Sequence, residues 1–159
     1  MSDGTQRPAR VATEVYMTDI VLPHQANGHG TMFGGEVMAL MDKAAAVAAL
    51  RFCRRPVLTA STERIDFRTP IHPGEIVEVR ARVIYVGRTS MIVRIHVYAE
   101  HPLKGDTRIC TTGYFSMVAI SLPGEVVVVP QLLLEDAEAR AEHVVGEEIK
   151  RAIAARRRA

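Results

Sequence analysis

The sequence predicts an α+β fold in which an antiparallel sheet of about five strands wraps around one long central helix. Residues 36–52 form one segment rich in Ala, Leu and Met, which are strong helix formers. After Pro56, apolar and polar residues alternate with a period of two, which indicates half-buried strands. The most economical arrangement of a sheet with a single apolar helix places that helix against one face of the sheet.

The composition fits one globular domain of ordinary size. The chain has 159 residues, of which 48% are hydrophobic, and a formal net charge of +2. The excess charge comes partly from the arginines at 156–158, so no basic face is indicated and we expect no nucleic-acid partner. The chain lacks both a signal-peptide segment and an apolar run of the roughly 18 residues that a membrane span needs. We therefore predict a cytoplasmic protein without a membrane partner.

Three regions differ in composition. Residues 1–11 are polar and non-periodic, and we expect a flexible leader. Residues 12–130 carry the periodic segments and form the predicted domain. Residues 131–159 are acidic first and basic last, an order that complements a helix dipole, so we expect a charged helical tail that is solvated or partly disordered.

Within the domain, the β-branched segment 13–22 is expected to be a strand, and the helix follows with Glu36 in its first turn, where an acid suits the dipole. Further strands are predicted at 57–67 and 109–120. The segments 78–86 and 90–100 alternate clearly and are joined by a short link that contains Gly87. They therefore predict a hairpin.

The loop ANGHGTMFGG before the helix is the first candidate site. Gly34 and Gly35 would leave unpaired N–H groups at the positive end of the helix dipole, which suits a negatively charged oxygen. If the ligand has a carbonyl, this is an oxyanion hole. Asn27 could orient the carbonyl or a water, or it could simply shape an Asn-Gly turn.

Other kinds of site are poorly supported by this sequence. The loop has neither the P-loop pattern nor G-x-G-x-x-G spacing. His24 and His29 lack a third ligand at a recognisable spacing, so we expect no metal. Cys53 and Cys110 have no C-x-x-C spacing and are expected to be reduced, buried thiols.

Asp42 is the second candidate. Between Val37 and Leu50 only Asp42 and Lys43 are not apolar. An unpaired buried charge is costly, so this carboxylate requires an explanation.

Three motifs together resemble the hotdog-fold acyl-coenzyme A thioesterases. They lie in the order that this family shows, within residues 13–121. They are Asn27-x-x-Gly30-x-x-Phe33-Gly34-Gly35 followed by Met41-Asp42, Glu63-x-x-x-Phe67-x-x-Pro70-x-x-x-Gly74, and Val86-Gly87-Arg88-Thr89-Ser90.

The resemblance implies a hotdog fold, dimers that pair their sheets edge to edge, and assembly into a trimer of dimers, that is, a hexamer. It implies hydrolysis of fatty acyl-CoA to free acid and CoA, in fatty acid metabolism. No metal or separate cofactor is implied, because coenzyme A is part of the substrate and product.

By position, Asp42 matches the family's catalytic carboxylate, Asn27 its catalytic asparagine, and Gly35 the glycine whose N–H polarises the thioester carbonyl. Glu36 departs from relatives that carry a large aromatic residue there, which leaves the acyl pocket's shape and chain-length preference open. The residues implied to contact substrate or CoA are Phe33, Gly34, Phe67, Gly87, Arg88, Thr89 and Ser90.

The spacing of Gly35 and Asp42 adds a geometric expectation. Seven residues of helix separate them by about 10 Å. A thioester carbon must lie about 3 Å from its attacking group while its oxygen contacts the donor. We therefore expect Asn27 and Gly35 of one protomer to face Asp42 of another. Asp42 could act as general base or as nucleophile.

Three alternatives are kept. The first is a non-catalytic acyl-CoA binding or sensing module on the same fold. The second is a hotdog dehydratase or hydratase, although the sequence has no clear His-x4-Gly-x-Pro pattern. The third is a structural oligomeric domain, in which Asp42 would only pair with a cation such as Lys43.

Overall fold

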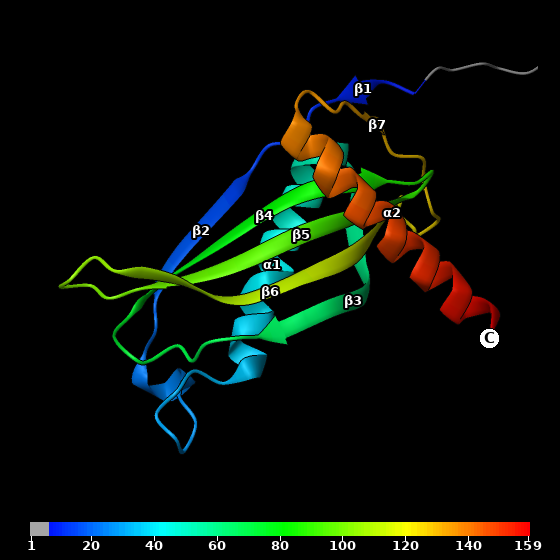
Figure 1. The fold of residues 1–159 in the computed structure, drawn as a ribbon. Helices are drawn as coiled ribbons and strands as arrows, with labels where there is room; N and C mark the ends of the chain where they lie inside the picture. Colours follow the sequence, from blue (N-terminus) through cyan, green and yellow to red (C-terminus); the bar gives the residue numbers. More distant parts are fainter. Residues whose placement is uncertain (1–6) are drawn as a thin grey trace, which may run out of the picture.

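A computed structural model describes residues 7–159. Five strands form one antiparallel sheet in the order β2-β4-β5-β6-β3, and the short strands β1 and β7 pair in parallel beside it (Figure 1). The elements in chain order are β1 (Ala9–Arg10), β2 (Val15–Ile20), the 3-10 turn η1 (Pro23–Gln25), α1 (Gly34–Cys53), β3 (Val57–Phe67), β4 (Ile76–Val86), β5 (Ser90–Glu100), β6 (Thr107–Ala119), β7 (Gln131–Leu132) and α2 (Ala137–Arg158).

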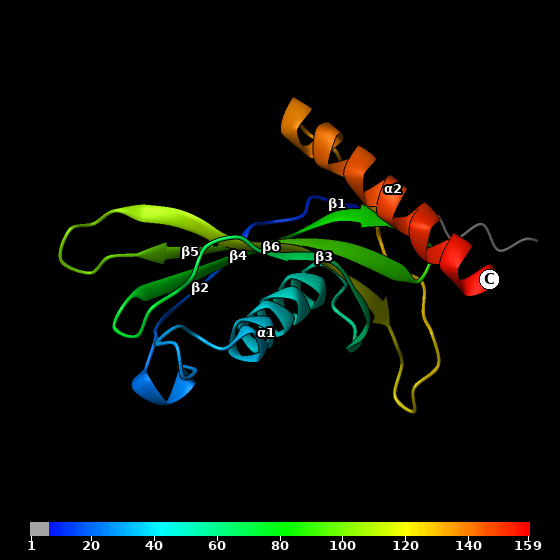
Figure 2. The ribbon, with the colours of Figure 1, turned by 60° about the horizontal axis from the view of Figure 1, so that its bottom comes forward.

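The two helices lie on opposite faces of the sheet. Figure 2 shows α1 on one face, which we call the inner face, and α2 on the other, the outer face. The predicted five-stranded sheet with one central helix is confirmed. The helix begins at Gly34, two residues before the predicted start, and ends at Cys53.

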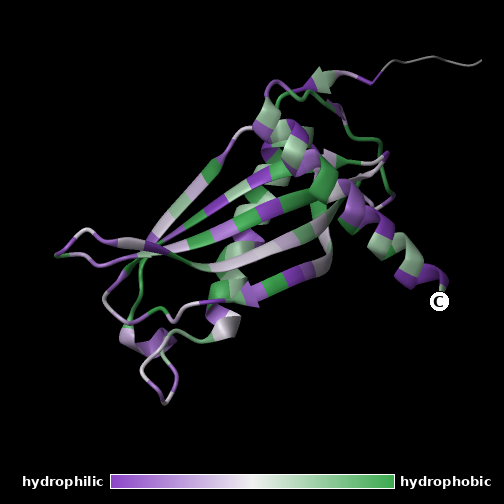
Figure 3. Cartoon of the chain, viewed as in Figure 1, coloured by the Kyte–Doolittle hydropathy of each residue, from purple (hydrophilic) through white to green (hydrophobic). Residues whose placement is uncertain are grey.

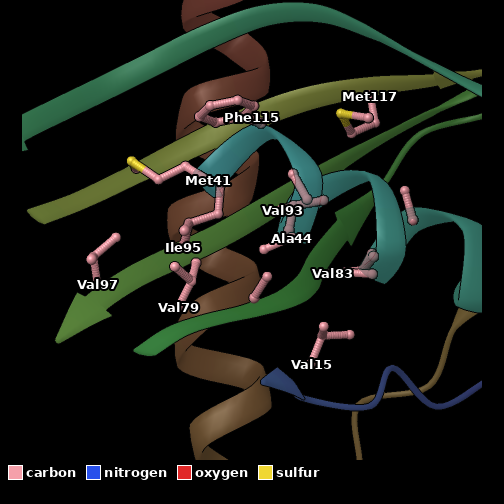
Figure 4. Close-up of a cluster of buried hydrophobic side chains, with 14 of the residues drawn as sticks. Val15, Met41, Ala44, Val79, Val83, Val93, Ile95, Val97, Phe115 and Met117 are labelled. Carbon is pink, nitrogen blue, oxygen red and sulfur yellow. The ribbon is translucent and has the colours of Figure 1, made fainter. Parts of the chain in front are cut away.

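The core lies between α1 and the inner face. Apolar and polar residues alternate along the strands, visible as bands of colour in Figure 3. Val93, Ile95 and Val97 of β5 point toward α1, where Met41 and small alanines of the helix meet them (Figure 4). Small side chains let a helix approach a sheet closely. Fully buried members of this core include Met41, Ala44, Ala45, Met91, Val93, Ile95 and Val97.

Strand β3 forms one edge of the sheet. Among residues 7–159 it pairs only with β6, and the ladder shifts register between Thr59 and Ser61 and again between Glu63 and Asp66. Most of its residues are exposed, and the side chain of Leu58 is 58% exposed. An 11-residue edge strand with one bare side is a template for pairing with another strand.

Helix α2 corrects the expectation of a solvated or partly disordered tail. Its N-terminus is capped by Asp136, whose side chain accepts a hydrogen bond from Ala139 N at 2.7 Å. Ile149 and Ile153 are each 1% exposed and pack with Ile84 and Ile92 on the outer face. The tail is helical, as predicted, but it is docked on the sheet.

The first six residues of the expected leader lie outside the described residues. The rest of that segment contacts the fold: Arg7 Nε donates to Val129 O at 2.7 Å, and Arg10 Nη1 donates to Phe52 O at 2.9 Å. The domain limits at residues 12 and 130 stay a prediction.

Candidate active site

The first part of the site is the loop that enters α1. Asn27 Oδ1 accepts hydrogen bonds from the backbone N–H groups of His29 at 2.9 Å and Thr31 at 3.2 Å. Asn27 Nδ2 donates to Thr31 Oγ1 at 2.9 Å, which uses one of its two hydrogens. The turn role considered for Asn27 is therefore present, and the second Nδ2 hydrogen can serve a ligand.

The start of α1 supplies free backbone donors. Val37 N donates to Phe33 O at 3.1 Å, so the N–H groups of Gly34, Gly35 and Glu36 precede the first helical hydrogen bond. Gly35 is exposed, and a Cβ at this position would have nothing within 4 Å, so a group can approach this part of the helix start closely. The Glu36 carboxylate is held to one side by Gln25 Nε2 at 3.3 Å.

Phe67 covers the other glycine. A Cβ built at Gly34 would lie 3.4 Å from Phe67 Cζ, so the glycine lets the aromatic ring lie against the helix start. Next to this contact is a cavity of about 340 Å³. It is lined by Thr31, Met32, Gly34, Val37, Phe67, Arg68, Thr69, Pro70, Ile71 and Thr111. We call it the glycine half-site. Phe33, the residue before α1, is 49% exposed and is not among the residues that line this cavity.

Asp42 lies in a second cavity. Thr59 Oγ1, on the edge strand β3, donates a hydrogen bond to Asp42 Oδ1 at 2.6 Å. The cavity measures about 300 Å³ and is lined by Met38, Ala39, Asp42, Thr59, Thr62 and Phe115. We call it the aspartate half-site. Asp42 is exposed in the single chain, so the concern about an unpaired buried charge does not arise there.

The two half-sites share no lining residue. Gly34 and Phe67 line the glycine half-site, and Asn27 is hydrogen-bonded to Thr31 in its wall, whereas Asp42 lines the other cavity. This agrees with the separation expected from seven residues of helix. Sequence reasoning missed Thr59, which is 17 positions from Asp42. Its hydrogen bond depends on how β3 lies beside α1, and no local motif indicates it.

The β4–β5 turn holds the remaining predicted residues. Gly87 N donates to Ser90 O at 2.8 Å, while the backbone oxygens of Arg88 and Thr89 accept from Val129 N at 2.8 Å and Ala119 N at 3.0 Å. These bonds fix the turn and leave the Arg88 side chain exposed. The turn lies apart from both half-sites, since none of its residues lines either cavity.

Other kinds of site find little support in residues 7–159. Within that range no group of three or more His, Cys, Asp or Glu side chains is arranged to hold a metal ion. In the same residues no helix is both long and apolar enough to cross a membrane. Cys53 and Cys110 are buried free thiols, and burial raises the pKa of each.

Comparisons with known proteins agree with this geometry. Residues 29–105 match the thioesterase superfamily. A Bacillus subtilis (strain 168) protein described as the uncharacterized acyl-CoA thioester hydrolase YkhA is 36% identical over 126 residues, which cover 79% of this chain and 73% of that protein. A structure described as an apo-hexameric acyl-CoA thioesterase is 30% identical with a TM-score of 0.89, covering 94% of this chain and 97% of its own.

A second solved structure is the acyl-CoA hydrolase from Staphylococcus aureus in complex with butyryl coenzyme A, coenzyme A and coenzyme A disulfide. It is 30% identical with a TM-score of 0.88, covering 94% of this chain and 93% of its own. That protein has also been solved with an asparagine, an aspartate and a threonine each changed to alanine. Those residues are 15 and 17 positions apart, as Asn27, Asp42 and Thr59 are here. The chain belongs to the acyl-CoA thioester hydrolases of the thioesterase superfamily, with the hotdog fold.

Proposed function

We propose that this protein hydrolyses fatty acyl-CoA thioesters to free acid and CoA at a site shared by two protomers. The observation that carries the proposal is the Asp42 carboxylate, held by Thr59 at 2.6 Å in an open cavity beside a bare sheet edge. Family membership supports the reaction class. The Staphylococcus aureus acyl-CoA hydrolase, which was solved in complex with butyryl coenzyme A and coenzyme A, supports the substrate class.

Pairing of two β3 edges would complete the site. A two-fold axis makes the paired strands antiparallel, so the Thr59 end of one strand lies beside the Phe67 end of the other. Thr59 belongs to the aspartate half-site and Phe67 to the glycine half-site. The dimer would thus join the two kinds of half-site across its interface, twice by symmetry. Further assembly into a trimer of dimers is our proposal, supported by the relative described as hexameric.

The joined half-sites have the groups that thioester hydrolysis needs. Gly35 N–H and the second hydrogen of Asn27 Nδ2 would donate to the carbonyl oxygen, where negative charge develops. Asp42 of the other protomer would take a proton from water as its oxygen attacks the carbonyl carbon. The C–S bond then breaks, and the CoA thiolate leaves and accepts that proton.

Asp42 could instead attack the carbonyl carbon itself and form an anhydride that water opens. In either route the Thr59 hydroxyl orients the carboxylate by engaging Oδ1, and Oδ2 remains for the reacting atoms. The asparagine, aspartate and threonine that were changed to alanine in the Staphylococcus aureus protein have the same spacing as Asn27, Asp42 and Thr59. This match supports a role for these three residues here. A cytoplasmic location stays a prediction.

The test is thiol release from acyl-CoAs of increasing chain length. Asp42→Asn is expected to lower kcat by at least about 100-fold, the usual contribution of a positioned base, without changing the oligomer. Asp106→Asn, an exposed acid in the turn before β6, is the matched control and should leave turnover unchanged. Tight CoA-thioester binding without turnover in the wild type would favour the non-catalytic binding module instead.

A further inference from the structure

Strand β3 carries a bulge next to Thr59. Thr59 pairs with Met117 on β6. Ser61 pairs with the very next residue of β6, Ser116, so Ala60 is an extra residue in β3. Side chains alternate between the two faces of a regular strand, and one extra residue shifts this alternation by one position. The residues that follow Ala60 therefore face the side opposite to the one that an unbroken strand would give them.

This shift brings both threonines of the segment to the aspartate half-site. Thr59 and Thr62 line the cavity that contains Asp42. Residues three positions apart face opposite sides of a regular strand, so the bulge is what lets both threonines line one cavity. Thr59 Oγ1 then donates to Asp42 Oδ1 at 2.6 Å. The orientation of the Asp42 carboxylate thus depends on the shape of β3 at this point.

Glu63 holds the bulged segment from the outer face of the sheet. Its Oε1 accepts a hydrogen bond from Ser61 Oγ at 3.0 Å, next to the bulge. Arg156 of α2 donates to both carboxylate oxygens of Glu63, at 2.7 and 3.1 Å, and these hydrogen bonds lower the pKa of Glu63. The Glu63 side chain is only 11% exposed, although β3 is an edge strand. We call these contacts of Glu63 with Ser61 and Arg156 the outer brace.

A second bulge of β3 lies beside the same helix. It falls between Glu63 and Asp66, and Arg64 within it has a φ of 46°, a left-handed conformation that residues with a side chain rarely adopt. The Arg64 guanidinium lies 4.0 Å from the carboxylate of Glu148 on α2. Helix α2 therefore contacts β3 at both of its irregular positions.

We propose that Glu63, held by Arg156 of α2, is a positioning residue for Asp42, because it fixes the bulge that turns Thr59 toward the carboxylate. This inference rests on the proposed function and extends it to a helix that lies outside the motifs resembling the family. Register is weakly specified where a strand is polar on both sides, and residues 59–63 read TASTE. Without the outer brace the extra residue can move to the other side of Thr59, which turns the Thr59 hydroxyl away from α1.

The test is a double-mutant cycle on thiol release from acyl-CoA. Arg156→Gln should lower kcat about 10-fold and leave KM unchanged, since a misplacement of about 1 Å at the reacting groups can cost up to about 100-fold. In a Thr59→Ala background the same change should have no further effect, because the outer brace acts through Thr59. Arg156→Lys keeps a cation beside Glu63 and should restore most of the wild-type kcat.

Arg151→Gln is the matched control. Arg151 is also on α2 but lies 3.7 Å from Glu147 of the same helix, so its loss should change neither kcat nor KM. The Arg156 side chain is 55% exposed near the end of α2, so Arg156→Gln should fold. Glu63→Ala also removes the hydrogen bond from Ser61 and should repeat the pattern with a larger loss of kcat.

Hydrogen exchange of residues 57–67, measured by mass spectrometry, tests the outer brace without turnover. These amides should exchange faster in Arg156→Gln than in the wild type or in Arg151→Gln. Unchanged exchange, an unchanged kcat for Arg156→Gln, or an equal loss of kcat with and without Thr59 would overturn the proposal. Faster exchange in Arg156→Gln, with no turnover even in the wild type, would refute the proposed function but not the outer brace.

Discussion

The two helices are held to the same sheet in different ways. Helix α1 buries eight residues against the inner face: Val37, Met41, Ala44, Ala45, Ala48, Ala49, Phe52 and Cys53. Helix α2 buries only four residues over a similar length: Ala139, Gly146, Ile149 and Ile153. The position of α1 follows from a continuous apolar surface, whereas α2 depends on two isoleucines and on polar contacts.

The main polar contact of α2 is an ion network under its first turns. Arg94, which is 5% exposed, donates to both carboxylate oxygens of Glu14 at 2.7 and 2.8 Å and to Glu142 on α2 at 2.9 Å. Arg82 Nε lies 3.5 Å from the second oxygen of Glu142. Such a network fixes one orientation of the helix, but each member depends on the others.

The largest effect is expected from Arg94→Met. It leaves the carboxylates of Glu14 and Glu142 partly buried without their shared cation, so the free energy of unfolding should fall by about 3–5 kcal/mol. Urea unfolding measures this loss. Arg80→Met removes a guanidinium that is 40% exposed on the same face and should cost less than about 1 kcal/mol. Equal stability of Arg94→Met and the wild type would show that α2 is held by apolar contacts alone.

A smaller effect is expected from Gly146→Ala. A Cβ at this position would overlap Tyr85 Cβ, so α2 must move away from the sheet. The expected cost of about 1–3 kcal/mol exceeds the roughly 1 kcal/mol that alanine gains over glycine within a helix. Thermal unfolding measures it, and Gly28→Ala, where nothing lies within 4 Å, is the control. A rise in the melting temperature would contradict the close contact.

The last effect appears only as the pH falls. Burial, and then the Arg94 guanidinium, lower the pKa of His96 on the outer face to about 4. Between pH 6.5 and 4 the unfolded chain therefore binds a proton that the folded chain does not, so stability should fall as the pH falls through this window. His96→Gln should flatten that slope, while exposed His24→Gln should not. Parallel stability–pH curves for His96→Gln and the wild type would contradict this.

The inner layer could be predicted because its signals are local. The alternation of Val93 and Ile95 with Arg94 and His96 shows which side of β5 packs against α1. The predicted helix start lies two residues too late because Gly34 and Gly35 have low helix propensity, although they occupy the first turn of α1.

The outer layer and part of the site could not be predicted because their contacts are sparse and distant. Ile149 and Ile153 alone do not indicate a buried helix among so many charges. Lys150 and Ser90 are 60 positions apart in the sequence, and only the register of β5 and the path of α2 bring them together. Thr59 likewise becomes recognisable only when β3 is seen beside Asp42.

The central claim is that each site combines half-sites from two chains. Gly35→Pro removes the N–H donor in the first helical turn, where proline is tolerated, and Asp42→Asn removes the carboxylate. Each variant alone should be nearly inactive. If the two variants are mixed and reassembled, half of the dimers contain one chain of each kind. One of the two sites in such a dimer is intact, so the mixture should regain about a quarter of wild-type thiol release. If mass spectrometry shows mixed dimers but thiol release does not rise above that of the separate variants, the shared site is contradicted.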